Sequence, residues 1–319
     1  MTVSPGIQVA ETPASTTTST RAASMIGDGG RLGRRAGRAK GRAGRFGLNA
    51  LAFIVIVCSV FPVYWMVNMS FTPPNQIISR NPSFLPFDFT FKNYVTAWTR
   101  EAAPGQTDFP HALLSSLAVG LAVVVAGALI AFLASIAIAR FAFRGRYVFI
   151  VSVLVVQMVP SEAMMFTIYN MIDDWRLMNT LVGLFIVHLA TVVPFTIWTL
   201  RGFVRGVPAE LEEAAQIDGC SKAQAFWKVT FPLLAPGLVA TGIFAFIQSW
   251  NEFLMALLFL KGYNLTLPPW LNSFQSATEA TNWGAVMAGS TLIALPVVIF
   301  FLFVQGRMVG GLVSGAVKG

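Results

Sequence analysis

Two carboxylates stand inside stretches of sequence that are otherwise strongly apolar. Glu162 lies two residues after Pro160, and Glu252 belongs to the run Trp250-Asn251-Glu252-Phe253. An ionisable group within a membrane span is energetically costly, so it usually faces a cavity or a polar partner. Aromatic faces together with amide or carboxylate groups suit a polyhydroxylated solute. Four residues are therefore candidates for a solute path, with helix–helix packing as the alternative role: Glu162, Trp250, Asn251 and Glu252.

The remaining chemically reactive side chains predict no catalytic or metal centre. His111 and His188 form no cluster at the spacing of metal ligands, so we expect packing or hydrogen-bonding roles for both. Cys58 and Cys220 are far apart, and Cys58 lies in an apolar run, which does not indicate a disulfide framework. A membrane enzyme would need a catalytic constellation that these isolated groups do not supply.

A polar segment over residues 208–231 carries signals for two short helices. Pro208 suits a first helical position, and three glutamates follow near the positive end of the helix dipole. Gly219 can supply the left-handed residue that ends the first helix. Ser221 and Gln224 have the spacing of a capping box that begins the second helix, and Pro232 is expected to limit its continuation.

The pattern of this segment resembles the EAA loop of binding-protein-dependent ABC importer permeases. The likeness rests on a Glu-Ala-Ala start, an Asp-Gly turn, and an aromatic residue and proline at fixed later spacing: Glu213, Ala214, Ala215, Asp218, Gly219, Phe226 and Pro232. Cys220 replaces the small alanine that is frequent at its position. Further features resemble the carbohydrate-uptake, maltose-type branch of that family: Phe71-Thr72-Pro73-Pro74, Asn93-Tyr94, Trp250-Asn251-Glu252-Phe253 and the glycine-rich C-terminus.

The resemblance implies a subunit of a larger importer. The EAA loop would form coupling helices that dock on a cytoplasmic ABC ATPase dimer, where Glu213 offers a carboxylate to a basic partner. This chain has no G-x-x-x-x-G-K-[ST] phosphate loop, so we expect ATP and Mg²⁺ in the separate ATPase, no cofactor in this chain, and no enzyme activity of its own. The other implied partners are a second permease subunit and an extracellular or periplasmic sugar-binding protein.

The elements that position these residues are expected to be membrane helices. Of the 319 residues, 55% are hydrophobic and 11% are charged, against about 25% charged in a typical soluble domain. Six stretches approach the roughly 20 apolar residues that a span needs. They are Leu48–Met69, Leu113–Ala139, Tyr147–Tyr169, Leu181–Leu200, Leu233–Leu260 and Ala285–Val304. The predicted fold is an all-α membrane protein with six transmembrane helices and the EAA loop between spans four and five.

The distribution of basic residues predicts the orientation in a bacterial inner membrane. With six spans, 17 of the 22 Lys and Arg residues fall on the side of both termini and 5 on the other side. The positive-inside rule therefore places both termini in the cytoplasm. The net charge of +8 accompanies no nucleic-acid recognition motif, so the lipid bilayer rather than nucleic acid is the expected partner.

Residues 1–46 differ from the rest of the chain. Thr/Ser/Ala runs precede a series of arginines among glycines, which favours a disordered basic cytoplasmic tail. An uncleaved first span is favoured over a signal peptide, because the apolar run is longer than a signal h-region. The permease domain is then expected to occupy residues 47–319.

Two alternatives remain at the level of the sequence. One is an importer permease for another solute, such as a phosphorylated polyol, although the expected spans have no interior Lys or Arg to favour an anion. The other is a secondary transporter, which would usually show inverted repeats. The sequence does not name the sugar.

Overall fold

The computed structural model describes residues 29–77, 84–85, 88–99, 107–275 and 281–316, with side chains from residue 47 to residue 303 within those ranges. Every regular element in these ranges is helical. The chain divides between Val63 and Tyr64 into two units. Helix α1 (Gly29–Ser70) contributes to both units, and all later helices belong to the second.

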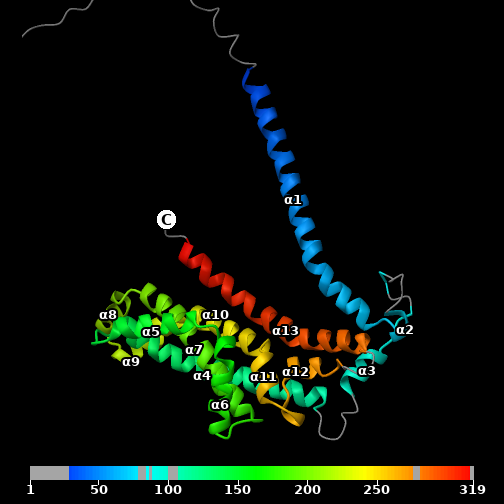
Figure 1. Cartoon of the computed structure of the whole chain (residues 1–319). Helices are drawn as coiled ribbons and strands as arrows, with labels where there is room; N and C mark the ends of the chain where they lie inside the picture. The colour runs from blue at the N-terminus through cyan, green and yellow to red at the C-terminus, as the bar shows by residue number, and fades with distance from the viewer. Residues whose placement is uncertain (1–28, 78–83, 86–87, 100–106, 276–280, 317–319) are drawn as a thin grey trace, which may run out of the picture. The chain divides into compact units, whose positions relative to one another are not determined.

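The helices follow one another with few long connections. In chain order they are α2 (Pro74–Ile77), α3 (Lys92–Trp98), α4 (Phe109–Arg140), α5 (Arg146–Met158), the 3₁₀ turn η1 (Ser161–Met164), α6 (Met165–Asp174), α7 (Leu181–Gly206), α8 (Glu210–Ile217), α9 (Lys222–Ala225), the π-helical turn η2 (Phe226–Thr230), α10 (Phe231–Trp250), α11 (Leu254–Phe259), the 3₁₀ turn η3 (Gly262–Asn264), α12 (Leu267–Asn272) and α13 (Trp283–Ala316). Figure 1 shows them along the chain.

Five helical stretches in the described residues are long and apolar enough to cross a membrane. They are Gly47–Ser70, Phe109–Arg140, Leu181–Gly206, Lys222–Trp250 and Trp283–Phe303. A sixth crossing is available only if α5 and the η1–α6 segment count together, and these two parts are bent by 85°. The all-α membrane fold is confirmed, with a broken third span in place of the straight helix expected over Tyr147–Tyr169.

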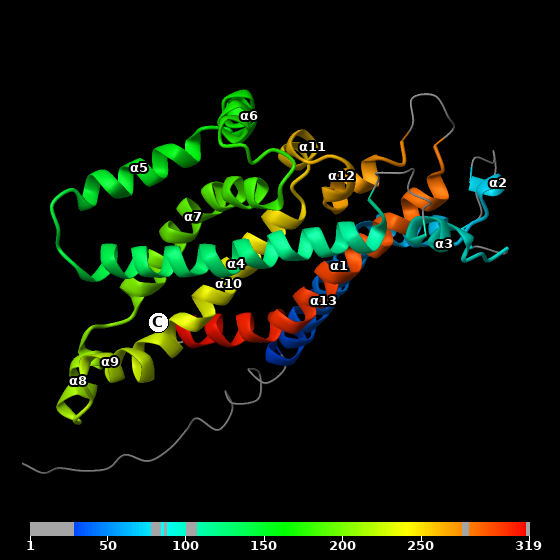
Figure 2. The same ribbon diagram turned by 90° about the horizontal axis from the view of Figure 1, so that it is seen from below.

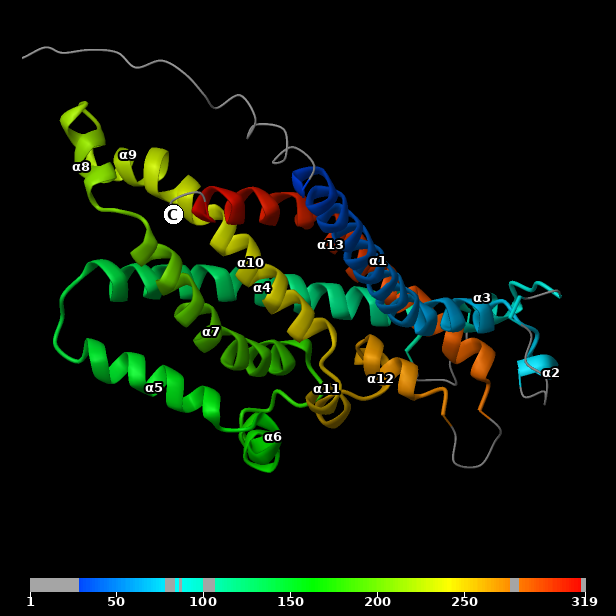
Figure 3. The same ribbon diagram turned by 90° about the horizontal axis from the view of Figure 1, so that it is seen from above.

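Three long helices, α4, α7 and α10, form the centre of the second unit. They pack against one another along their lengths (Figures 2 and 3). Val123 of α4, Val192 of α7 and Ala245 of α10 are buried in one shared apolar cluster. Gly237 lets α10 approach α7 closely, because a Cβ there would lie 2.6 Å from Phe203 Cγ. This packing fixes the ends of α4, α7 and α10 relative to one another.

Two segments that are far apart in the loop between α1 and α4 meet at the end of α1. Asn93 of α3 is buried, and its Nδ2 donates to the Ser70 carbonyl at 2.9 Å and to the Thr72 carbonyl at 2.7 Å. The rings of Phe71 and Tyr94 lie 4.9 Å apart. The Phe71–Pro74 and Asn93-Tyr94 signals of the sequence are therefore parts of one packed structure.

Several predicted boundaries differ from the observed ones. Helix α1 begins at Gly29, so residues 29–46 are helical where a disordered tail was expected, and residues 1–28 lie outside the described residues. Span five ends at Trp250 rather than Leu260, because the chain breaks at Asn251–Phe253 before α11. Pro232 does not stop the preceding helix: the chain continues from α9 through the π-helical turn η2 into α10, and Pro232 is the second residue of α10. The domain boundary at residue 46 stays a prediction.

Candidate functional site

The first candidate site is the hairpin formed by α8 and α9, which lies at one end of the bundle between α7 and α10 (Figure 2). Gly219 has a φ of +92°, as its place at the end of α8 predicts. The Cys220 N–H donates to the Ala215 carbonyl at 2.9 Å, which closes the turn. The predicted capping box is confirmed: Ser221 and Gln224 each accept from the other's backbone N–H. Pro208 is not the first residue of α8, which begins at Glu210.

The hairpin residues singled out from the sequence fall into two groups. Glu213, Ala214 and Asp218 are exposed on the outside of the hairpin. Ala215 is buried, and Phe226 packs with its ring centroid 6.0 Å from that of Phe132 on α4. The first group is available to another protein, whereas the second fixes the hairpin to the bundle.

Sequence reasoning missed the polar contacts that join this hairpin to the rest of the bundle. The Arg140 Nη2 at the end of α4 donates to Glu212 Oε1 at 3.1 Å and to the Val207 carbonyl at 3.2 Å. The Thr230 hydroxyl donates to the same Glu212 oxygen at 2.6 Å. Glu212 appeared from the sequence only as a helix-dipole carboxylate. Its partner Arg140 is 72 residues away, and no local pattern links them.

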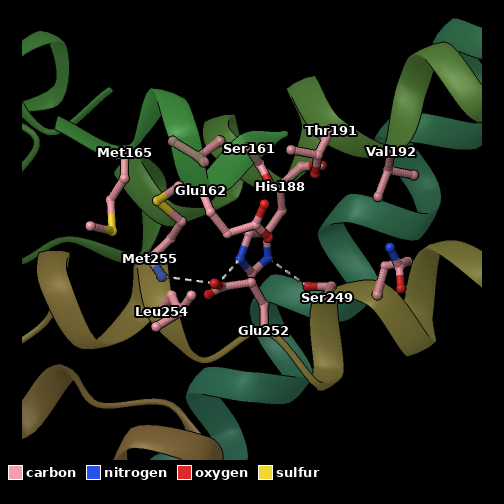
Figure 4. A pocket seen from close by; sticks show the side chains of 12 residues that line it. Ser161, Glu162, Met165, His188, Thr191, Val192, Ser249, Glu252, Leu254 and Met255 are labelled. Carbon is pink, nitrogen blue, oxygen red and sulfur yellow. Dashed lines mark hydrogen bonds and ion pairs between the residues drawn. The ribbon is translucent and has the colours of Figure 1, made fainter. Parts of the chain in front are cut away.

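The second candidate site is a partly buried polar network at the break after α10. Glu252 accepts hydrogen bonds from the backbone N–H groups of Met255 at 2.7 Å and Ala256 at 2.9 Å, so it caps the start of α11. Its Oε2 also lies 3.3 Å from His188 Nε2 of α7. The other ring nitrogen of His188 lies 2.9 Å from Ser249 Oγ. Figure 4 shows this chain of contacts from α10 to α7.

A cavity of about 170 Å³ opens beside this network. Its polar lining includes Glu162 and Ser161 from η1, Thr191 from α7 and Gln248 from α10, in addition to the His188 network (Figure 4). An adjoining groove of about 480 Å³ shares Glu162, Thr191 and Gln248 and extends along α5 and α6. The groove falls within the size range of small-molecule sites, about 300–1,000 Å³. Among the described residues, no Lys, Arg, Phe, Tyr or Trp side chain lines either space.

The four residues predicted to line a solute path are therefore only partly brought together. Glu162 and Glu252 both line the cavity. Trp250 is 1% exposed, stacks on Phe246 with ring centroids 5.2 Å apart, and belongs to another apolar cluster. Asn251 donates its side-chain N–H back to the Ile247 carbonyl at 3.0 Å. The structure does not bring Trp250 and Asn251 to the cavity, and His188, Ser249 and Gln248 take that place.

Comparison with known proteins decides the family. The model of the family described as "binding-protein-dependent transport system inner membrane component" matches residues 124–309, which is more than half of the chain. The chain belongs to this family. It is a multi-pass permease subunit of an ABC-type import system. The matched region contains α7, the α8–α9 hairpin, α10 and the residues that line the cavity and the groove.

Two relatives match this permease over most of its length. The diacetylchitobiose uptake system permease protein DasC of Streptomyces coelicolor is 45% identical over 277 residues, covering 86% of this chain and 98% of that protein. The trehalose transport system permease protein SugB of Mycobacterium tuberculosis is 33% identical, covering 83% of this chain and 95% of that protein.

A solved structure agrees with the permease fold. A chain of a bacterial ABC transporter involved in the import of the acidic polysaccharide alginate superposes with a TM-score of 0.70, covering 83% of this chain and 96% of that chain. At 21% sequence identity, this likeness concerns the fold alone.

Proposed function

We propose that this permease pairs with a second permease subunit to form the membrane path for a neutral sugar or oligosaccharide. The observation that carries the proposal is the 45% identity with a permease named for diacetylchitobiose uptake, which extends over 86% of this chain. The second relative is named for the transport of trehalose, and trehalose is also a neutral sugar. The cavity and groove agree in chemistry, because the described residues that line them offer hydroxyl, amide, imidazole and carboxylate groups and include no Lys or Arg.

The α8–α9 hairpin is the proposed contact with the ATPase. Glu213 and Ala214 are exposed next to each other, so a carboxylate stands beside a small side chain that admits a close partner. The hairpin is held by a left-handed glycine and a capping box, so it presents these groups on a defined surface. Binding of ATP and Mg²⁺ and hydrolysis belong to the separate ABC ATPase dimer in this proposal.

The orientation and the remaining partner follow from the charge distribution. Both termini and the α8–α9 hairpin face the cytoplasm, where the ATPase operates, because most Lys and Arg residues lie on that side. The opposite side contains α3 and the α11–α12 region, which are then available to a solute-binding protein outside the cell.

The proposal is tested by purifying the complex through a tag on this chain and reconstituting it in vesicles. The sugar panel contains diacetylchitobiose, trehalose, maltose and a phosphorylated polyol, with and without ATP inside the vesicles. We expect an ABC ATPase and a second permease to co-purify, and ATP-dependent uptake of one neutral sugar when its binding protein is added. Uptake driven by an ion gradient without ATP would indicate a secondary transporter. Preference for the phosphorylated polyol would contradict the neutral-sugar assignment.

A further inference from the structure

We propose that Arg140, Glu212 and Thr230 form a latch that transmits movement of the α8–α9 hairpin to the long helix α4. This proposal rests on the proposed function, because it concerns how ATPase movement reaches the spans. The three side chains, together with the Val207 carbonyl, are called the polar node. Glu212 is a positioning residue in this account, distinct from the exposed Glu213.

The geometry of the polar node joins three elements through one carboxylate oxygen. Glu212 Oε1 on α8 accepts from Arg140 Nη2 at 3.1 Å and from Thr230 Oγ1 at 2.6 Å. Arg140 is the last residue of α4, and Thr230 is the last residue of the π-helical turn that leads into α10. The second donation of Arg140, to the Val207 carbonyl, adds the connection between α7 and α8. Displacement of α8 therefore pulls on α4 and on the start of α10 together.

The π-helical turn positions the hydroxyl that completes the node. Pro232 has no N–H to donate to the Lys228 carbonyl, so the regular helical ladder is interrupted immediately after Thr230. The wider turn takes up this interruption, and a Phe231 N–H donates to the Phe226 carbonyl five residues back. Thr230 is 1% exposed and directs its hydroxyl at Glu212. Short π segments of this kind occur frequently at functional sites.

A separate apolar contact supports the fold of the same region. The Phe132 ring of α4 lies 6.0 Å from the Phe226 ring and 5.9 Å from the Phe231 ring, measured between centroids. This contact involves none of the node's groups, so we expect it to keep η2 and the start of α10 packed on α4 when the node is altered. The Arg140 and Glu212 side chains are 23% and 26% exposed, so water reaches both groups and can solvate one when the other is removed, which lowers the cost of losing the pair. The directional contacts of the node therefore serve to fix the angle of the hairpin more than to hold the fold together.

The test compares variants of the node in the reconstituted importer with its ATPase, partner permease and binding protein. The variants are Glu212→Gln, Arg140→Gln and the double substitution, and Glu210→Gln is the matched control because Glu210 is exposed on the same helix. Uptake of radiolabelled sugar, diacetylchitobiose first, is divided by ATP hydrolysed in the same vesicles. ATPase recovery and the melting temperature are measured on each preparation.

We expect each single variant to lower uptake per ATP at least about fivefold, the lower end of common coupling between sites. ATPase recovery and melting temperature should equal those of the parent protein. The double variant should lose no more than either single variant, because the two groups act as one pair. Glu210→Gln should behave as the parent.

A second comparison uses the hydroxyl of the node. Thr230→Ser keeps a donor for Glu212 and should retain the parent ratio of uptake to ATP hydrolysis. Thr230→Val keeps the shape of the side chain, removes the donor and should lower that ratio. Equal ratios for these two variants would contradict the role of the hydroxyl.

The latch is overturned if Glu212→Gln and Arg140→Gln keep the parent ratio while the parent imports sugar. It is also overturned if their losses follow lower ATPase recovery or melting temperature, since the node would then be structural. Losses that multiply in the double variant would show two independent groups. If the parent complex imports no sugar with ATP, the proposed function fails and the latch falls with it.

Discussion

At the scale of single residues, the two carboxylates that first indicated a solute path have different surroundings. Glu252 accepts two backbone N–H groups at the start of α11 and contacts His188, so its oxygens are largely satisfied by the protein. Glu162 is exposed and lines both the cavity and the groove. We therefore expect Glu252 to hold the shape of the site and Glu162 to be the carboxylate more accessible to solute.

The different roles of the two carboxylates predict different effects of substitution. Glu252→Ala leaves the Met255 and Ala256 N–H groups without their acceptor, which costs about 1–3 kcal/mol for a buried group. Its melting temperature in detergent should fall clearly. Glu162→Gln should leave the melting temperature unchanged and alter the sugar concentration that gives half-maximal uptake. A stable Glu252→Ala variant, or a Glu162→Gln variant with parent uptake at every concentration, would contradict this division.

At the scale of elements, the α8–α9 hairpin was predictable because its signals are local. Gly219 and the Ser221–Gln224 capping box act within a few residues, and both behave in the structure as their spacing predicts. The sequence did not predict the end of α10 at Trp250, because no Gly or Pro marks it. The break becomes visible only when Glu252 is seen capping α11 and pairing with a histidine 64 residues away.

The bend of the third span was only partly predictable from the sequence. Pro160 follows Val159, whose backbone is extended, as expected for a residue before proline. The proline was visible in the sequence, but membrane helices also accommodate proline with only a kink. The 85° angle depends on how the η1–α6 segment packs on α7 and α11, which a linear pattern does not contain.

The hairpin turn gives a prediction at the element scale. Gly219→Ala places a side chain in a left-handed conformation, which costs roughly 1–2 kcal/mol. A Cβ added at Gly219 would meet no other atom within 4 Å, so the cost comes from the backbone conformation and not from a clash with neighbouring residues. Amide hydrogen exchange in α8 and α9 should become faster. Gly202→Ala in α7 is the control, because that helical position is also open and should be neutral or slightly stabilised. Equal exchange in both variants would contradict the strained turn.

At the scale of the whole molecule, the second unit connects two functional ends through α4, α7 and α10. The hairpin lies where α7 ends and α10 begins, and the cavity lies where α10 ends and α11 begins. Helices α7 and α10 therefore reach both the proposed ATPase surface and the proposed solute path, and α4 packs against both of them. Composition predicted a membrane bundle, but not which helices form its centre, because that depends on close approaches such as Gly237 on Phe203.

The topology is tested by labelling single cysteines from outside the cell, in a background in which Cys58 and Cys220 are replaced by serine. A cysteine at exposed Lys92 should react with an impermeant maleimide, whereas one at Ile217, which is 86% exposed, should react only after permeabilisation. Lys92 is chosen over Asn93 because Asn93 is buried. Labelling at Ile217 but not at Lys92 in intact cells would contradict the predicted orientation and indicate the opposite one.

The most direct measurement of the central claim is sugar uptake together with ATP hydrolysis by hairpin variants in one set of vesicles. Glu213→Ala removes the exposed carboxylate, and Gly219→Pro forbids the positive φ of the turn. Both variants should insert in the membrane at parent levels and lose sugar-stimulated ATP hydrolysis and uptake at least about tenfold, within the common range for coupling between sites. Gly219→Pro should also recover less ATPase, and Glu210→Ala should match the parent. Full uptake by both Glu213→Ala and Gly219→Pro at normal expression would show that the α8–α9 hairpin is not the element that couples ATP hydrolysis to transport.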